Sequence, residues 1–181
     1  DVFARQGLPI LCLEPSCASA LTDDLPDLID DAELGQRVAQ CVKMIDVFLD
    51  EEVQAGKIPP LAVEAGRGFV MHGHCHQKSA FGTSAIHNHF DRAPDAELTE
   101  IDSGCCGMAG SFGYHHYDIS RQVGEDRLFP AIRQAVEEDK TIIACGISCR
   151  HQLHDMLQIR AKHWVEVARP GEPIRTDDDT K

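Results

Sequence analysis

A short apolar run leads into a cysteine-bearing turn in the stretch Thr141-Ile142-Ile143-Ala144-Cys145-Gly146-Ile147-Ser148-Cys149. The β-branched residues of the run indicate a buried strand, and the helical spacing of Leu153, Met156 and Leu157 indicates a helix after the turn. The stretch Ile10-Leu11-Cys12-Leu13-Glu14-Pro15-Ser16-Cys17 has the same form, an apolar run, a kink and then Ser-Cys. This faint internal repeat indicates two related halves built from strand–turn–helix units, and its alignment places Cys12 in the core.

Strands and helices alternate along the rest of the chain. We expect strands at 8–13, 68–71, 97–101, 141–144 and 163–167. A long helix is expected from a capping box at Asp30 and Glu33 to about Val53, with Cys41 on its apolar face. This alternation predicts an α/β fold: a parallel sheet of four to five strands, with helices on both faces and repeated βα units.

Further helices are expected between the later strands. One follows the second strand and extends to about Phe90. Another is capped by Asp118 and carries Ile119, Val123 and Leu128 on one face, before Pro130 starts a new first turn.

The cysteines of the chain follow the expected strands. Cys17 follows the first strand, Cys75 the second, Cys105 and Cys106 the third, and Cys145 and Cys149 the fourth. Ligands of parallel α/β sheets bind outside the carboxyl ends of the strands. We therefore expect these cysteines to meet at one edge of the sheet.

Adjacent cysteines stand in the turn Ser103-Gly104-Cys105-Cys106-Gly107-Met108-Ala109-Gly110. Neighbouring residues meet the geometry of a disulfide only with strain. Two thiols at one point of a glycine-rich turn indicate a soft metal, above all a cluster with more than one iron. The alternative is that both are small buried apolar residues.

Composition limits the class of protein. The net charge of −13 argues against binding to nucleic acid, and no apolar run approaches the length of a membrane span. Eight cysteines without a signal peptide indicate reduced thiols in a protein that is cytoplasmic, or peripheral at the inner membrane. The chain begins at Asp1 and opens almost directly on a strand, so we expect it to be part of a longer polypeptide.

The ligand chemistry leaves alternatives open. Four thiolates on three turns, from Cys75, Cys105, Cys106 and Cys149, suit an iron–sulfur cluster, with Cys145 as a candidate fifth ligand. Zinc is the rival metal, and His72, His74 and His76 offer imidazoles to it, with His74 retained as a candidate ligand. Lys78 and Arg150, at helix starts, are candidates to balance the negative charge of a cluster.

A nucleophilic cysteine is a third alternative. The run from Cys145 to Arg150 faintly resembles a phosphatase loop, although it is one residue too short. That interpretation leaves the double cysteine unexplained.

These motifs together resemble the cysteine-rich CCG domain family. The stretches that carry the resemblance are Glu-Pro-Ser-Cys at 14–17, His-Cys-His-Gln-Lys at 74–78, Gly-Cys-Cys-Gly-Met-Ala-Gly at 104–110 and Ser-Cys-Arg-His-Gln at 148–152. They are most similar to the C-terminal part of FAD-linked D-2-hydroxyacid dehydrogenases of the D-lactate type. The domain recurs in heterodisulfide reductase and in the iron–sulfur subunits of glycolate oxidase and anaerobic glycerol-3-phosphate dehydrogenase.

The resemblance implies a 4Fe-4S cluster, non-cubane in some members, with Cys75, Cys105, Cys106 and Cys149 as ligands. The family's last pair is usually Cys-x-x-Cys, so Cys145 is out of register here, and Cys17 would close a first half-domain. Residues 1–60 would then be the tail end of that first half-domain plus the long connecting helix. Residues 61–181 would be a second half-domain that carries the cluster.

The expected function is electron transfer within a larger flavin-dependent oxidoreductase that acts on 2-hydroxyacids. FAD, in a domain outside this sequence, would take a hydride from the substrate, and the cluster would pass electrons singly to a downstream acceptor. No general base or flavin fingerprint is visible, so this chain by itself is not expected to be catalytic. The alternative is a zinc-binding structural or docking module without redox activity.

Overall fold

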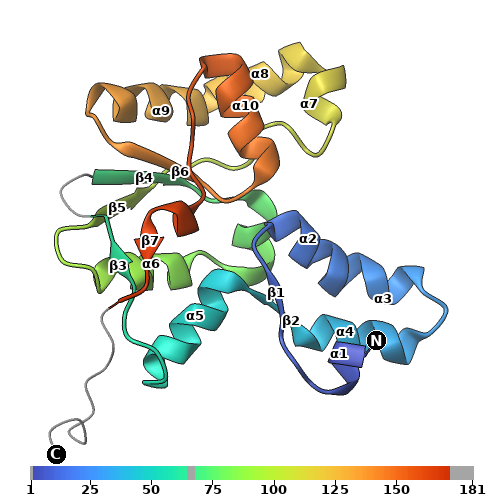
Figure 1. Ribbon diagram of the computed structural model, residues 1–181. Helices are drawn as coiled ribbons and strands as arrows, with labels where there is room; N and C mark the ends of the chain where they lie inside the picture. Colours follow the sequence, from blue (N-terminus) through green and yellow to red (C-terminus); the bar gives the residue numbers. More distant parts are fainter. Residues whose placement is uncertain (1, 65–67, 172–181) are drawn as a thin grey trace, which may run out of the picture.

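The computed structural model describes residues 2–64 and 68–171 (Figure 1). It has the predicted α/β architecture, in which parallel strands are flanked by helices. The central sheet has three parallel strands in the order β5-β4-β6: β4 (Gly68–His72), β5 (Glu97–Glu100) and β6 (Thr141–Ala144). Within the described ranges, no helix combines the length and the apolar character needed to cross a membrane.

Helices cover both faces of the central sheet, because its strand residues point alternately to either side. Val70 and Ile142 face α9 (Leu128–Glu137) and α10 (Ile147–Leu157), where they pack with Ile132 and Leu153. On the opposite face, Phe69, Met71 and Ile143 pack with residues of α5 (Ile45–Gln54) and α6 (Ser84–Asp91). Figure 1 shows the sheet between these two layers of helices.

A second, smaller lobe is formed by the N-terminal part of the chain. Its strands β1 (Ile10–Cys12) and β2 (Val42–Met44) pair in parallel. The helices of this lobe are α1 (Val2–Arg5), α2 (Pro15–Ser19), the π-helical turn η1 (Ala20–Asp24), α3 (Leu25–Leu28) and α4 (Ala32–Cys41). The parallel strands are therefore divided between a three-stranded and a two-stranded sheet, where the sequence pattern predicts one sheet of four to five strands.

The prediction of one long helix that extends to Val53 is wrong. The segment forms two helices, α4 and α5, separated by strand β2. Val42 and Met44 alternate inward along β2 and give β1 its only partner strand among the described residues, as Ile10 pairs with Val42. The capping residue is also displaced by one position: the carboxylate of Asp31 accepts the backbone N–H of Leu34 at 2.9 Å.

The prediction of which face of the helix after Asp118 is buried is wrong as well. In α8 (Tyr117–Asp126), Ile119 and Val123 are 51% and 39% exposed, and the buried positions are Ser120 and Gly124. Small residues lie inward because the ring of Phe129 approaches closely, and a Cβ at Gly124 would lie 2.4 Å from its Cζ. Asp118 lies in the first turn, and the N-cap residue is His116.

Two other expected elements are replaced by shorter ones. The strand expected at 163–167 is wrong: it is the 3-10 helix η3 (Trp164–Glu166), which a capping box between His163 and Glu166 starts. The strand β7 (Ala168–Arg169) follows it and pairs antiparallel with β3 (Ala62–Val63). The helix expected up to Phe90 is divided by Gly82, whose φ is +76°, into η2 (Gln77–Phe81) and α6.

Candidate metal centre

Four cysteine side chains meet at the carboxyl ends of the three parallel strands. Cys75 starts the helical turn after β4, Cys105 and Cys106 follow β5, and Cys149 is the third residue of α10, after β6. The thiol of Cys105 lies within hydrogen-bonding distance of those of Cys75 and Cys106, and Cys106 contacts Cys149 in turn. All four are free cysteines. The convergence expected of these four residues is what the structure shows.

The four sulfurs alternate in their preference for a proton. Hydrogen bonds from the thiols of Cys106 and Cys75 lower the pKa of Cys105 to about 2. The hydrogen bond from the Cys106 thiol also holds the pKa of Cys149 well below its usual value, although burial opposes the shift. The pKa values of Cys75 and Cys106 are raised, because the Cys75 thiol lies against the thiolate of Cys105, the Cys106 thiol lies between the thiolates of Cys105 and Cys149, and both thiols are desolvated. Two thiolates therefore share two protons, and these are protons that a metal displaces on binding.

The double-cysteine turn is held tightly by its neighbours. Gly107 has a φ of +98°, and its N–H donates to the sulfur of Cys105 at 3.3 Å. A Cβ at this position would lie 2.7 Å from the carbonyl oxygen of Ser120, so only glycine fits here. The Lys78 ammonium donates to the carbonyl of Ser103. Lys78 thus acts on the backbone of this turn, and the described contacts give it no direct bond to a sulfur.

The start of α10 positions the sulfur of Cys149. Gly146 precedes the helix, and a Cβ there would lie 2.1 Å from the His74 ring and 3.2 Å from the Cys149 sulfur. The carboxylate of Glu14 accepts the backbone N–H of Ile147 at 2.8 Å, so a residue of the smaller lobe caps this helix. Arg150 donates to the carbonyls at the end of β6, those of Ala144 at 2.8 Å and Cys145 at 2.6 Å, instead of pointing at the thiols.

His72, and not the candidate ligand His74, is the histidine that groups with the sulfurs. It is the last residue of β4 and is fully buried. A ring nitrogen of His72 and the sulfurs of Cys106 and Cys149 all lie within 4.8 Å of one another. Nδ1 pairs with the hydroxyl of Ser103 at 2.8 Å, whereas the buried Nε2 has no oxygen or nitrogen partner, and the His72 ring helps to lower the pKa of the Cys149 thiol. Nε2 is therefore the nitrogen available to the sulfurs or to a metal between them.

His74 lines the cavity beside the thiols. This cavity, of about 360 Å³, is bounded by three of the four cysteines together with Ser16, His76 and Ser148. The Nδ1 of His74 accepts the backbone N–H of His76 at 3.2 Å, and its ring packs against Gly146. Ligation by His74 stays a prediction, since its ring is not part of the group that His72, Cys106 and Cys149 form.

The remaining candidate ligands lie apart from the four thiols. Cys145 is buried in the core on the opposite face of the sheet, with Phe69, Met71 and Trp164. Burial raises the pKa of its thiol, and the carboxylate of Asp46 raises it further. Cys17 is exposed on α2 in the smaller lobe. The structure therefore does not bring either residue into the group of four.

The motifs do not predict the roles of three further residues of the centre. Ser103 orients His72, the side-chain amide of Gln152 donates to the carbonyls of Cys106 and Ser120, and Glu14 caps α10. The alternation of side chains along the strands could have shown which residues point toward the centre. In β4 and β6 the residues Val70, His72, Ile142 and Ala144 share one face, and Cys145 points to the other.

The donor set fits an iron–sulfur cluster. Four sulfurs joined by a continuous series of contacts, two of them held as thiolates, are the usual ligands of such clusters. The N–H of Gly107 beside Cys105 and the ring nitrogen of His72 beside Cys106 and Cys149 are the kinds of groups that hydrogen-bond cluster sulfurs. Cys75 and Cys105 are half-buried, whereas Cys106 and Cys149 are buried, so the centre opens to the surface on the Cys75 side.

Known proteins resemble this chain over most of its length. It is 26% identical over 168 residues to one of the subunits of the anaerobic glycerol-3-phosphate dehydrogenase of Escherichia coli (strain K12), an alignment that covers 91% of the chain and 41% of that protein. It is 26% identical over 157 residues to the D-2-hydroxyglutarate dehydrogenase of Pantoea ananatis (strain AJ13355), and this alignment covers 83% of the chain and 14% of that protein.

A third relative matches a shorter part of the chain. The glycolate oxidase iron–sulfur subunit of Escherichia coli (strain K12) is 29% identical over 76 residues, 41% of the chain and 16% of that protein. No protein-family model and no solved structure matches the chain. The chain spans less than half the length of each of these relatives. The resemblance inferred from the cysteine motifs is confirmed: the chain is a homologue of D-2-hydroxyglutarate dehydrogenase and of subunits of glycolate oxidase and anaerobic glycerol-3-phosphate dehydrogenase.

Proposed function

We propose that this chain is the iron–sulfur electron-transfer part of a larger flavin-dependent oxidoreductase that acts on 2-hydroxyacids. The observation that carries the proposal is the contact between the sulfurs of Cys75, Cys105, Cys106 and Cys149, which come from three different turns. A 4Fe-4S cluster bound there would supply a one-electron carrier whose reduction potential is set by burial and by hydrogen bonds to sulfur. The name of one relative contains the words iron–sulfur subunit.

Some residues around the sulfurs position the sulfurs and the His72 ring, and others exclude water from them. Gly107 donates to Cys105, and Ser103 keeps the ring of His72 beside Cys149. Met108 and Leu153 are buried in the same core as Cys106 and Cys149, so water is excluded on that side. A redox partner would approach from the opposite side, through the cavity that Cys75 and Cys105 line.

The substrate class rests on the relatives. Glycolate and D-2-hydroxyglutarate, which two of their names contain, are 2-hydroxyacids, whereas the third name contains glycerol 3-phosphate. An FAD-binding domain of the same polypeptide or complex is the proposed electron donor. No general base is proposed within this chain, which by itself should not oxidise a hydroxyacid.

Zinc is the second candidate because His72, Cys106 and Cys149 form a group with ligand atoms close together. Mixed cysteine and histidine ligation suits a structural zinc site. In that case the chain would be a docking module without redox activity.

Reconstitution under anaerobic conditions separates the two candidates. The chain, incubated with iron and sulfide, should show broad visible absorption and an EPR signal on reduction with dithionite. Cys41→Ser is the matched control, since Cys41 lies in the smaller lobe, and it should keep both signals. A colourless protein that instead retains one tightly bound zinc per chain would contradict the proposal.

A further inference from the structure

The repeat in the sequence is also a repeat of structure. When the two cysteine-bearing stretches are aligned on their final cysteines, Leu11 of β1 corresponds to Ile143 of β6. Leu11 pairs in parallel with Lys43 of β2, and Ile143 pairs in parallel with Lys162. Each pairing joins the strand to the next extended segment after its helices, and such crossovers have a fixed hand. β2 therefore occupies the edge of β1 that corresponds to the Lys162 edge of β6.

The opposite edges of β1 and β6 differ. Ile143 also pairs with Met71, so β4 occupies the second edge of β6. Among the residues that the structure describes, β2 is the only strand that pairs with β1. A strand with one partner leaves a row of backbone N–H and C=O groups unpaired, and this row is a template for a further strand. The edge of β1 that corresponds to the β4 side is therefore open.

The apolar side chains at β1 and β6 differ in the same way. Ile143 and Cys145, which point to one face of the central sheet, are 0% and 1% exposed. Their counterparts in the smaller lobe, Leu11 and Leu13, are 38% and 52% exposed. Large apolar side chains thus lie at the surface at positions whose counterparts in the central sheet belong to the core.

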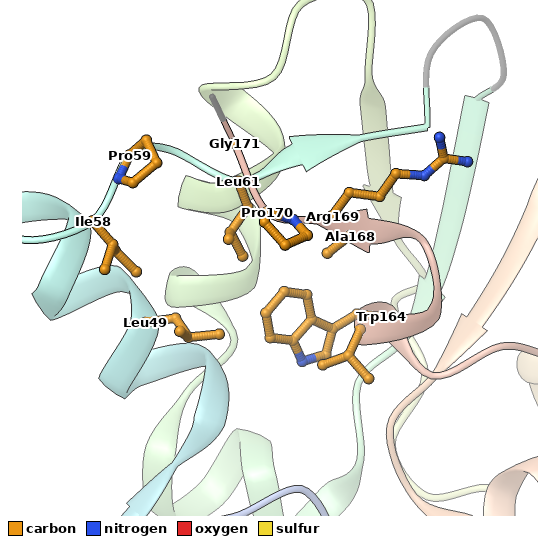
Figure 2. A pocket seen from close by; sticks show the side chains of 10 residues that line it. Leu49, Ile58, Pro59, Leu61, Trp164, Ala168, Arg169, Pro170 and Gly171 are labelled. Carbon is orange, nitrogen blue, oxygen red and sulfur yellow. The ribbon is translucent and has the colours of Figure 1, made fainter. Parts of the chain in front are cut away.

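The exposure is confined to one face of the β1–β2 sheet. In the central sheet the matching face is covered by residues of α5, α6 and η3, among them Leu49 and Trp164, which Figure 2 shows. The other face is covered in both lobes, since Cys12 is 8% exposed and its counterpart Ala144 is 0% exposed. Parallel sheets normally have helices on both faces. The β1–β2 sheet therefore has one face that is only partly covered.

The helix before β1 extends the comparison. Leu8 follows α1 and donates its N–H to the carbonyl of Phe3 at 3.2 Å, and Lys140 follows α9 and donates to the carbonyl of Ala135 at 2.9 Å. The residue before each donor has a positive φ, of +65° and +52°. α1 thus matches the last turn of α9, but it comprises four residues where α9 has ten. The earlier turns of α9 have no counterpart in the described part of the smaller lobe.

We propose that the open edge of β1 pairs with a parallel strand that precedes residue 1 in the same polypeptide. A helix after that strand covers Leu11 and Leu13. In the central sheet the matching strand, β4, precedes β6 along the chain and is followed by α6. The alignment with the glycerol-3-phosphate dehydrogenase subunit covers 41% of that protein, so this relative has the additional length that such a unit needs. The pairing requires neither metal nor flavin, so the inference stands independently of the proposed function.

Hydrogen exchange followed by mass spectrometry tests this pairing. It compares the 181-residue chain with the complete product of its gene. The β1 amides on the open edge should exchange at least about tenfold more slowly in the complete product, the factor to which one net hydrogen bond corresponds. The amides of β4, which has partners on both edges, are the control and should exchange equally in both proteins.

A variant of Leu11 tests the covering helix. Leu11→Lys places a charge where that helix would pack. In the complete gene product it should raise the exchange of the β1 amides to the rate of the 181-residue chain. Leu28→Lys is the matched control, because Leu28 is 78% exposed on α3 of the same lobe, and it should leave the exchange unchanged.

Three results would overturn the proposal. They are equal exchange of β1 in the two unmodified proteins, undiminished protection of β1 in folded Leu11→Lys, and protection that rises as the 181-residue chain dimerises with increasing concentration. The last result would make a second copy of the chain the occupant of the edge. Comparison of the two unmodified proteins decides the matter even if Leu11→Lys does not fold.

Discussion

Single cysteines differ in what their surroundings allow them to do. Cys105 and Cys149 are held as thiolates by donors within the centre, whereas Cys145 is a neutral thiol among apolar side chains. Strand alternation explains the difference, because Cys145 follows Ala144 and must point to the opposite face of the sheet. The sequence motifs predict which turns meet. The face of the sheet to which each residue points decides which side chains reach the centre.

Cysteine variants test this division. Cys105→Ser and Cys106→Ser should abolish the visible and EPR signals of the reconstituted chain, because each removes one of four sulfur ligands. Cys145→Ser should keep the signals and instead lower the free energy of unfolding by about 1–3 kcal/mol, since it buries a hydroxyl in an apolar site. Equal loss of iron in all three variants would show that Cys145 is a ligand.

His72 should tune the centre without being needed to assemble it. His72→Phe removes the nitrogen that lies beside Cys106 and Cys149. Loss of a hydrogen bond to a charged sulfur disfavours the more negative reduced state, so the reduction potential should fall by about 60 mV, the equivalent of about 1.4 kcal/mol for one electron. Redox titration followed by EPR measures the shift. Retention of the wild-type potential would contradict the role, and complete loss of iron would make His72 a ligand.

Helix α10 is the element on which the two lobes meet. Its N-terminus is capped by Glu14 of the smaller lobe, and the His163 ring pairs with the carbonyl of Leu13 at 3.1 Å. The repeat in the sequence predicts a strand, a kink and a helix in both places, and β1–α2 and β6–α10 have that form. The contact between them was not predictable, because it depends on how the lobes pack.

Removal of this cap should destabilise the chain measurably. Glu14→Ala should lower the free energy of unfolding by about 1 kcal/mol, as N-cap removal typically does. Glu14→Gln retains an acceptor oxygen and should lower it less. Urea denaturation measures both, with Glu33→Gln as the control, because the Glu33–Arg37 ion pair is exposed and contributes little. Equal stability of wild type and Glu14→Ala would show that the lobes do not depend on this contact.

Asp46, in the first turn of α5, should make stability depend on pH. Burial raises the pKa of its carboxyl to about 6, although the Gln77 amide and the backbone lower it. Folding therefore favours the protonated form. The resulting stabilisation is present below about pH 4, and it is lost as the pH rises through 6, by about 3 kcal/mol in all.

Asp46→Asn removes this dependence, because an amide cannot ionise. The groups that face Asp46 are Asp50, His89 and Cys145, and burial lowers the pKa of His89. Since these groups remain in the variant, the difference between the two profiles of unfolding free energy from pH 4 to 7 isolates Asp46. A difference that does not change with pH would contradict the raised pKa.

The fold class of the whole molecule agrees with the sequence prediction, whereas the division of the chain into individual sheets and helices differs from it. The alternation of strands and helices and the convergence of Cys75, Cys105, Cys106 and Cys149 were predictable, since both follow from the order of elements along the chain. The break at Val42–Met44 was not, because a helical apolar pattern and a short alternating strand look alike over three residues. The boundary at residue 60 between two half-domains stays a prediction, and residues 172–181 lie outside the described part.

Anomalous diffraction from anaerobic crystals of the reconstituted chain tests the central claim most directly. Data collected at the iron absorption edge should place all of the iron in one cluster, within bonding distance of the sulfurs of Cys75, Cys105, Cys106 and Cys149. An anomalous signal at the zinc edge in that position, or iron bound without these four sulfurs, would contradict the account.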